Sequence, residues 1–340
     1  MIQAPRSGQQ RIVRHAGFPD PKHPVDKTMN PRKTWGLAAA LCFPLLAQAA
    51  DPESCSTVRF ADVGWTDITV TTAVTRYVLT ELGYSTQVKR LSVPDTYKAM
   101  ADKKIDVFLG NWMPSMENDI APYREKGSVD TLGANLEGAK YTLAVNKAAW
   151  DGGLKNFSDL ARFRKELGGK IYGIEPGNDG NKLIGRMISE NAFGVGDFQL
   201  VESSESSMLA QVKRAEHLKQ WVVFLGWEPH PMNNTFEMQY LAGGDDYFGP
   251  NFGGATVYTN TRAGLAKECP NLGRLLKNLR FSLAMENHLM GAVLNQSTNR
   301  RREAKAWLKE NPADLARWLE GVTTRDGKPA DPALNLAAEP

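Results

Sequence analysis

Two short stretches that resemble each other decide the fold of this chain: VFLGNWMP at Val107–Pro114 and VVFLGWEP at Val222–Pro229. Each is an apolar run that reaches a glycine, then a tryptophan, then a proline. A third stretch, VRFADVGWTD at Val58–Asp67, follows nearly the same plan. A tryptophan that only fills a core needs no such arrangement. The three stretches therefore predict strands that each present an indole ring at or just beyond their carboxyl end.

These stretches lie within an alternating pattern of strands and helices. We predict strands at 56–65, 85–93, 105–110, 139–146, 170–177, 198–204, 221–227 and 254–260. We predict helices at 66–84, 94–104, 157–169, 178–194, 205–220, 269–294 and 302–322. Strands that alternate with helices are typical of an α/β fold, in which a mostly parallel sheet is covered by helices. The two VFLG strands place one such series in each half of the chain.

Five of the eight tryptophans fall into two groups, whereas Trp150 and Trp221 could belong to either. Trp307 and Trp318 sit on the apolar side of helical periods, which predicts that they pack in the core. Trp65, Trp112 and Trp227 each stand at or just beyond the carboxyl end of a predicted strand, and the carboxyl ends of strands in open α/β sheets border the ligand crevice. The sequence therefore predicts that three indole rings, from both halves of the chain, converge on one cleft.

A cleft lined by indole rings suits either a sugar or a quaternary ammonium group, which binds by cation–π attraction. Sugars need many hydrogen-bonding groups, and few stand near these tryptophans: Asp67, Glu228 and the loop EPGNDGN at Glu175–Asn181. This scarcity favours the cation. The alternative, that the tryptophans only pack, stays open on spacing alone.

The amino-terminal region predicts export. From Met29 the chain has a charged segment with Arg32 and Lys33, an apolar run at 35–46 and the cleavage pattern Ala-Gln-Ala at 47–49, which together predict a secretory signal peptide at 29–49. Residues 1–28 have no apolar period, and we interpret them as an upstream extension from a mis-assigned start. Cys42 lies in the apolar run and is expected to leave with the leader.

Removing the leader changes the charge argument. The whole chain has a formal net charge of +3, but residues 1–49 hold seven of its 41 Lys and Arg residues and only two of its 38 acidic residues. The remaining chain is therefore close to neutral, which gives no electrostatic reason to expect a nucleic-acid partner. It keeps two cysteines, Cys55 and Cys269, which in an exported protein favour one disulfide over two free thiols.

Six motifs between about Val58 and Trp318 carry a family resemblance: FADVGWTDIT, DVFLGNWMPSMENDIAPY, GAKYTLAVN, KIYGIEPGNDGNKLI, ESSESSMLAQVKRAE and VVFLGWEPHPMN. They resemble the periplasmic substrate-binding proteins of quaternary-amine ABC importers, the glycine betaine/choline group, and most of all its choline-binding branch. The resemblance implies an α/β, two-lobed periplasmic binding protein (type II-like), with a mixed sheet flanked by helices in each lobe. It implies that lobe 1 comprises 50–140 and about 238–340, that lobe 2 comprises about 141–237, and that the ligand lies between them.

The resemblance also implies a site. The family binds its ligand with four aromatic side chains and two polar groups, and the matching positions here are Trp65, Trp112, Tyr141, Trp227, Asp67 and Asn178. It implies a disulfide between Cys55 and Cys269, choline as the ligand, and the membrane permease of an ABC importer as the partner. It further implies a monomer that is not an enzyme and that uses no cofactor and no metal.

Three rival functions remain. Glycine betaine or carnitine could be the ligand, although Asp67 disfavours the carboxylate of betaine. An exported enzyme would need a poised base. We interpret His217 as solvated, His288 as packed in a helix and His230 as a structural loop residue between two prolines, and the loop at Glu175–Asn181 lacks the Lys-Ser/Thr of a phosphate-binding loop. A sensory role in chemotaxis fits the same features as transport does.

Overall fold

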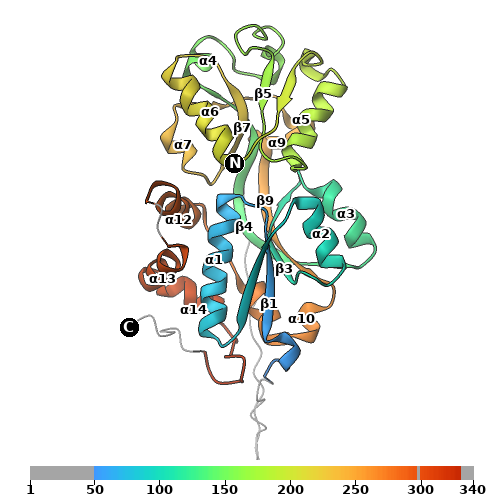
Figure 1. The fold of residues 1–340 in the computed structure, drawn as a ribbon, viewed down its shortest axis with the longest axis vertical. Helices are drawn as coiled ribbons and strands as arrows, with labels where there is room; N and C mark the ends of the chain where they lie inside the picture. The colour runs from blue at the N-terminus through green and yellow to red at the C-terminus, as the bar shows by residue number, and fades with distance from the viewer. Residues whose placement is uncertain (1–49, 297–298, 331–340) are drawn as a thin grey trace, which may run out of the picture. The chain divides into compact units, whose positions relative to one another are not determined.

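A mixed β-sheet runs through the part of the chain that the structure describes, residues 50–296 and 299–330 of a computed structural model (Figure 1). Its strands are β1 (Thr57–Asp62), β2 (Ser85–Arg90), β3 (Val107–Met113), β4 (Val129–Asn146), β5 (Lys170–Tyr172), β6 (Gln199–Val201), β7 (Val223–Glu228), β8 (Met238–Tyr240) and β9 (Gly254–Arg262). They lie in the order β2-β1-β3-β9-β4-β7-β5-β6, and β8 pairs with β4.

Helices cover this sheet. The α-helices are α1 (Thr66–Glu81), α2 (Val93–Ala101), α3 (Glu117–Glu125), α4 (Lys147–Asp151), α5 (Asp179–Ser189), α6 (Glu205–His217), α7 (Met232–Thr235), α8 (Asp245–Phe248), α9 (Pro250–Gly253), α10 (Leu265–Glu268), α11 (Pro270–Asn278), α12 (Leu283–Gln296), α13 (Arg300–Glu310) and α14 (Pro312–Trp318). Short 3-10 helices are η1 (Glu53–Cys55), η2 (Phe157–Asp159) and η3 (Ala192–Gly194).

The sheet has a parallel group of strands at each end. β1 lies parallel to β2 and β3, and β5 lies parallel to β6 and β7. The residues of β3 and β7 are buried up to their last positions, which explains why their sequences read as continuous apolar runs. The alternating strand and helix pattern thus folds into the α/β, two-lobed architecture that the sequence predicts.

Two long strands connect the parallel groups. β4 and β9 lie side by side as an antiparallel pair at the centre of the strand order, and both extend through the two halves seen in Figure 1. β4 pairs with β7 in one half and, through its earlier residues, with β9 in the other. This central pair is where the chain crosses between the halves.

The helix predicted at 157–169 is wrong. Only Phe157–Asp159 form a short 3-10 helix, and turns follow up to Gly169. Phe157, Leu160 and Leu167 are nevertheless buried, so the apolar spacing that suggested a helix is satisfied by a series of turns. Asp159 accepts hydrogen bonds from the backbone N–H groups of Lys155 and Asn156, which favours a tight turn at this point.

The two long helices predicted near the carboxyl end are each divided. Two helices, α11 and α12, stand where one was predicted at 269–294, and two others, α13 and α14, stand where one was predicted at 302–322. The second break coincides with Pro312, the first residue of α14. α12 and α13 pack against α1 (Figure 1). The rings of Trp307 and Trp318 stack at 5.9 Å, and both side chains are buried. These tryptophans are core residues, as their helical period predicts.

The predicted disulfide is present. Cys55 in η1 and Cys269, directly before α11, are bonded, with their Cα atoms 5.9 Å apart and a sequence separation of 214. The predicted signal peptide at 29–49, the extension at 1–28 and Cys42 lie outside the described residues. Within residues 50–296 and 299–330 no helix is long and apolar enough to cross a membrane, and no group of His, Cys, Asp and Glu side chains could hold a metal ion.

Candidate ligand-binding site

One enclosed pocket gathers all six side chains that the sequence nominates. Its lining consists of Trp65, Asp67, Trp112, Tyr141, Ile174, Asn178, Asp179 and Trp227, around a small cavity of about 20 Å³. The residues come from both halves of the sheet. Each of the six nominated side chains is at most 6% exposed, so the pocket is closed on several sides.

The strands place the aromatic rings by their register. Trp112 is the penultimate residue of β3, and Trp227 is the penultimate residue of β7. Tyr141 on β4 lies directly opposite Trp227 in the antiparallel β4–β7 pair. Each tryptophan is followed within two residues by a cis peptide bond to proline, at Met113–Pro114 and Glu228–Pro229. The repeated sequence thus brings one ring to the pocket from each half.

The four aromatic residues Trp65, Trp112, Tyr141 and Trp227 form what we call the aromatic box. The ring centres of Trp112 and Tyr141 lie 6.0 Å apart with tilted planes, and those of Tyr141 and Trp227 lie 6.5 Å apart edge to face. At these distances and angles the rings contact one another favourably, so they form a continuous aromatic wall of the pocket.

Two of the box residues have their polar atoms committed to protein partners. The Tyr141 hydroxyl donates to Oδ1 of Asn178 at 2.8 Å, and the Trp65 indole N–H donates to Oε1 of Glu175 at 2.8 Å. Gly180 allows this arrangement, because a Cβ there would lie 2.1 Å from the Tyr141 hydroxyl. These rings therefore offer the pocket π-surface rather than hydrogen bonds.

Asp67, in contrast to these rings, has a polar atom without a protein partner among the residues that the structure describes. Its side chain is 1% exposed, and neither its Oδ1 nor the indole Nε1 of Trp112 has a hydrogen-bond partner of normal geometry within the described residues. Burial, followed by the negative charge of Glu205, raises the pKa of Asp67 to about 8, although backbone amides and the Trp112 indole oppose this rise. An unsatisfied carboxyl oxygen at a pocket wall is ready to pair with a ligand.

Further carboxyl groups make the surroundings acidic. Burial raises the pKa of Glu175 to about 7 and that of Asp179 to about 6. Asp67 and Asp179 lie in the first turns of α1 and α5, where they oppose the positive charge of the helix ends. A cation in the pocket would favour the ionised form of all three groups. The pocket is therefore electrostatically complementary to a positively charged ligand.

Sequence reasoning missed two of the lining residues, Ile174 and Asp179. Asp179 directly follows Asn178 in the loop EPGNDGN, which the sequence identified as close to the site. A run of polar residues, however, does not reveal which of its side chains face the pocket. Glu205, which influences Asp67, lies 138 residues away in sequence and gave no signal at all.

His230 does not have the geometry of a catalytic base. Its Nδ1 accepts a hydrogen bond from the backbone N–H of Met232 at 2.9 Å, and its Nε2 lies 3.3 Å from Oε1 of Glu205. The ring packs 4.9 Å from the ring of Trp227 and is buried. Both nitrogens are thus occupied by protein partners, as expected for a structural loop residue.

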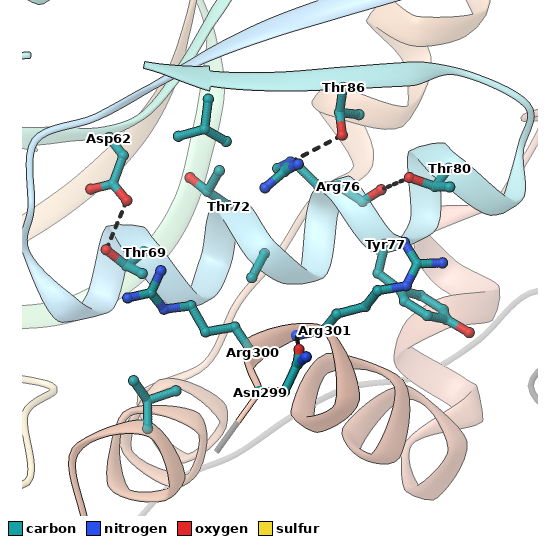
Figure 2. Close-up of a pocket in the computed structure, with 13 residues that line it drawn as sticks. Asp62, Thr69, Thr72, Arg76, Tyr77, Thr80, Thr86, Asn299, Arg300 and Arg301 are labelled. Atoms are coloured by element: carbon teal, nitrogen blue, oxygen red, sulfur yellow. Dashed lines mark hydrogen bonds between the residues drawn. The ribbon is translucent and has the colours of Figure 1, made fainter. Parts of the chain in front are cut away.

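A larger and more open hollow has the wrong charge for a cation. Figure 2 shows it between α1, β2 and the start of α13, with the side chains of Arg76, Arg300 and Arg301 along its walls. Arg76 donates to the hydroxyl of Thr86 at 3.0 Å, and Asp62 is the acidic residue that lines it. Three guanidinium groups would repel a quaternary ammonium group. The aromatic pocket is therefore the candidate site.

Comparison with known proteins agrees with this geometry. Residues 56–310 match the OpuAC family, the substrate binding domain of ABC-type glycine betaine transport system. A solved structure of an ABC-transporter choline binding protein in complex with choline is 59% identical, with a TM-score of 0.81, over 84% of this chain and 98% of that chain. The unliganded semi-closed conformation of such a protein is 58% identical, with a TM-score of 0.77 and the same coverage.

A curated protein from Chromohalobacter salexigens, called Uncharacterized protein ORF1, is 51% identical over 147 residues, which are 43% of this chain and 95% of that protein. The family match covers well over half of the chain and includes every residue of the candidate site. This chain therefore belongs to the family of substrate-binding domains of ABC-type glycine betaine transport systems.

Proposed function

We propose that this protein binds choline in the aromatic box and delivers it to the membrane permease of an ABC importer. The observation that carries the proposal is the pocket itself, in which four aromatic side chains and the buried carboxyl group of Asp67 enclose one small space. The 59% identity to an ABC-transporter choline binding protein, solved with choline, supports the same ligand here.

The aromatic box supplies the affinity. The charge of a trimethylammonium head is spread over its methyl groups, so the head leaves water at low cost and contacts ring faces directly. A desolvated cation–π contact contributes about 2 kcal/mol. Four partial walls can approach the roughly 8 kcal/mol of micromolar binding, which remains below the ceiling of about 1.5 kcal/mol per atom for very small ligands.

The polar residues select the tail of the ligand. In our proposal Asp67 accepts a hydrogen bond from the choline hydroxyl or offsets the charge of the head. Asn178 accepts a hydrogen bond from Tyr141 at Oδ1 and donates one from its amide to Asp179 at 3.2 Å, so in our proposal it offers the ligand the remaining N–H of that amide. The unpaired Oδ1 of Asp67 supports this role, because an acceptor without a partner gains most from a donor.

Glycine betaine or carnitine is the second candidate, since the family name refers to glycine betaine. Both ligands carry a carboxylate, which would lie close to Asp67, Glu175 and Asp179. The trimethylammonium head favours the ionised form of these groups, and ionised carboxylates in a buried site repel the carboxylate of a ligand, so this acidic pocket favours choline. An enzymatic role has less support, because His230 is held by Met232 and Glu205. We propose that the protein is not an enzyme.

The cellular setting completes the proposal. Membership of an importer family and the disulfide between Cys55 and Cys269 support a periplasmic location. We propose that residues 29–49 are the signal peptide, that the protein acts as a monomer, and that its lobes are 50–140 with about 238–340, and about 141–237. The central pair of β4 and β9 supports two crossings between these lobes.

Calorimetric titration tests the proposal. The refolded, ligand-free protein is titrated with choline, glycine betaine, carnitine and a panel of sugars. We expect micromolar or tighter binding of choline, weaker binding of the two carboxylates and no binding of sugars. Tighter binding of glycine betaine than of choline would identify glycine betaine as the ligand. Binding of sugars alone would reject the cation site.

A further inference from the structure

Glu205 does not line the pocket, yet its carboxylate is buried between the two halves of the protein. The residue is 6% exposed and begins helix α6. Its Oε2 accepts a hydrogen bond from the backbone N–H of Thr66 at 2.9 Å, and its Oε1 accepts one from the Thr66 hydroxyl. Thr66 begins helix α1. A carboxylate at the start of one helix therefore caps the start of another, 139 residues away in sequence.

Helix α1 needs this cap. Its N-cap residue is Trp65, whose side chain makes no capping hydrogen bond. The first N–H groups of a helix have no partner within the helix and are commonly satisfied by a side chain from the preceding residue. Here Glu205 takes that role from the opposite half. The amino ends of α1 and α6 both carry partial positive charge, and both favour an anion at this position.

A third contact ties Glu205 to the other wall of the box. His230 accepts a hydrogen bond at Nδ1 from Met232, so its proton is on Nε2, which faces Oε1 of Glu205 at 3.3 Å. The His230 ring packs against Trp227. Glu205 thus joins the loop that follows Trp227 to the residue between Trp65 and Asp67.

We infer that Glu205 is a latch, a positioning residue that holds the aromatic box closed around its ligand without touching the ligand. While the latch is engaged, Trp65 and Asp67 are fixed relative to Trp227. Opening the box requires breaking the bonds between Glu205 and Thr66 in addition to the bond between Trp65 and Glu175, so the latch lengthens the time that the ligand stays. The inference rests on the proposed function only for the identity of the ligand.

The central test is the kinetics of choline release from Glu205→Gln. An amide keeps the shape, removes the charge and directs an NH2 group at a donor, so at least one bond of the latch is lost. The matched control is Glu216→Gln. Glu216 lies on the same helix and also accepts a backbone N–H bond, but its partner is Glu237, at 3.1 Å, and not a residue of α1.

Stopped-flow dissociation should show that Glu205→Gln releases choline about tenfold faster, a change of 1.4 kcal/mol, while its association rate stays within about twofold. Glu216→Gln should behave as the wild type. A merely structural role would lower the melting temperature and leave the dissociation rate unchanged. A dissociation rate in Glu205→Gln within about twofold of the wild-type value would overturn the latch.

Thr66→Val provides the partner variant, because it removes the hydroxyl and keeps the N–H. Combined with Glu205→Gln it should accelerate release by clearly less than the product of the two single effects, since both changes break the same contact. Full additivity would contradict a shared latch.

A ligand-free measurement separates the latch from the ligand assignment. Amide hydrogen exchange at Thr66 should be faster in Glu205→Gln than in the wild type or Glu216→Gln. If the wild type fails to bind choline, the proposed function fails, and this measurement still decides the latch. Equal exchange at Thr66 in all three proteins would reject it.

Discussion

Asp67 is the residue that can distinguish choline from glycine betaine. Both ligands present the same trimethylammonium head to the aromatic box, so the difference must be read at the tail. A carboxylate facing a hydroxyl accepts a charge-assisted hydrogen bond, worth about 1.5–3 kcal/mol, whereas two buried carboxylates repel. Asp67→Asn keeps the shape and supplies a donor. It should weaken choline binding and narrow or reverse the preference over betaine.

The measurement is a calorimetric titration of both ligands into both proteins, reported as the ratio of the two affinities. Asp62→Asn is a suitable control, because Asp62 lies at the end of β1 but lines the other hollow. If the ratio of choline affinity to betaine affinity is the same in Asp67→Asn as in the wild type, Asn178 and not Asp67 distinguishes the two ligands.

The protonation of Asp67 makes binding dependent on pH. Its pKa of about 8 in the empty protein means that the carboxyl group is mostly protonated at pH 6. A bound cation favours the ionised form, so binding should release a proton. The choline affinity should therefore fall as the pH drops below 8, by up to about tenfold per pH unit.

Titrations between pH 6 and 9, in buffers of different ionisation enthalpy, count the released protons. In Asp67→Asn a weaker dependence should remain, from Glu175 and Asp179 at lower pH and from Glu286, a buried carboxyl group that interacts with Asp67 and whose pKa burial raises. The stability of the empty protein should change in the opposite sense. Native Asp67 keeps a proton between about pH 4 and 8 that the unfolded chain has released, so stability falls as the pH rises through this window. An affinity that is constant from pH 6 to 9 would contradict this assignment.

Two tryptophans should respond differently to removal. Trp227→Ala deletes one wall of the box and should abolish high-affinity binding. Trp318 stacks on Trp307, meets Phe281 edge to face and is fully buried. Trp318→Ala should cost about 3–5 kcal/mol of stability and leave the affinity of the folded fraction unchanged. Calorimetry and thermal unfolding of both variants give the comparison. Binding within about threefold of wild type in Trp227→Ala would remove Trp227 from the site.

At the scale of single elements, Asn178 has two tasks that can be separated. As the N-cap of α5 its Oδ1 accepts from the backbone N–H of Asn181 at 3.1 Å, and it also accepts from the Tyr141 hydroxyl. Asn178→Ala should lose the cap, at about 1 kcal/mol, and also release Tyr141. Asn178→Ser keeps a capping oxygen on a shorter side chain that no longer reaches Tyr141.

Thermal unfolding and choline titration of both variants separate the tasks. The affinity should fall in both. The melting temperature should also fall in both, because the buried Tyr141 hydroxyl loses its partner, but it should fall further in Asn178→Ala, which loses the cap as well. Equal melting temperatures in the two variants would mean that the cap contributes little to stability.

The elements also show how far sequence reasoning reaches. The VFLG stretches predicted both the buried strands and the rings at their ends. A strand that is buried on both faces has a continuous apolar sequence, which can be recognised without knowing its neighbours. The segment 157–169 failed because the same apolar spacing is compatible with a helix and with a series of turns. Glu205 was missed for a different reason, since a contact over 139 residues leaves no local pattern.

At the scale of the whole molecule, ligand binding should bring the two lobes together. Trp112 and Trp227 come from opposite halves, and only the crossing strands β4 and β9 need to bend to separate them. Small-angle scattering should give a smaller radius of gyration with saturating choline than without it. Glu205→Gln should shift the empty protein toward the larger radius. An unchanged radius on addition of choline would argue against a closing cleft.

The bond between Cys55 and Cys269 also has a mechanical meaning. Every residue of the aromatic box lies between these two cysteines, inside a covalent ring that spans 214 residues. If the ends of the chain are pulled apart, tension passes from η1 through the disulfide into the carboxyl-terminal helices and bypasses the ring. In the oxidised protein only the segments outside the ring can be drawn out. Reduction would add about 700 Å of contour length to the part of the chain that force can extend, so the disulfide protects the ligand-binding site from mechanical unfolding.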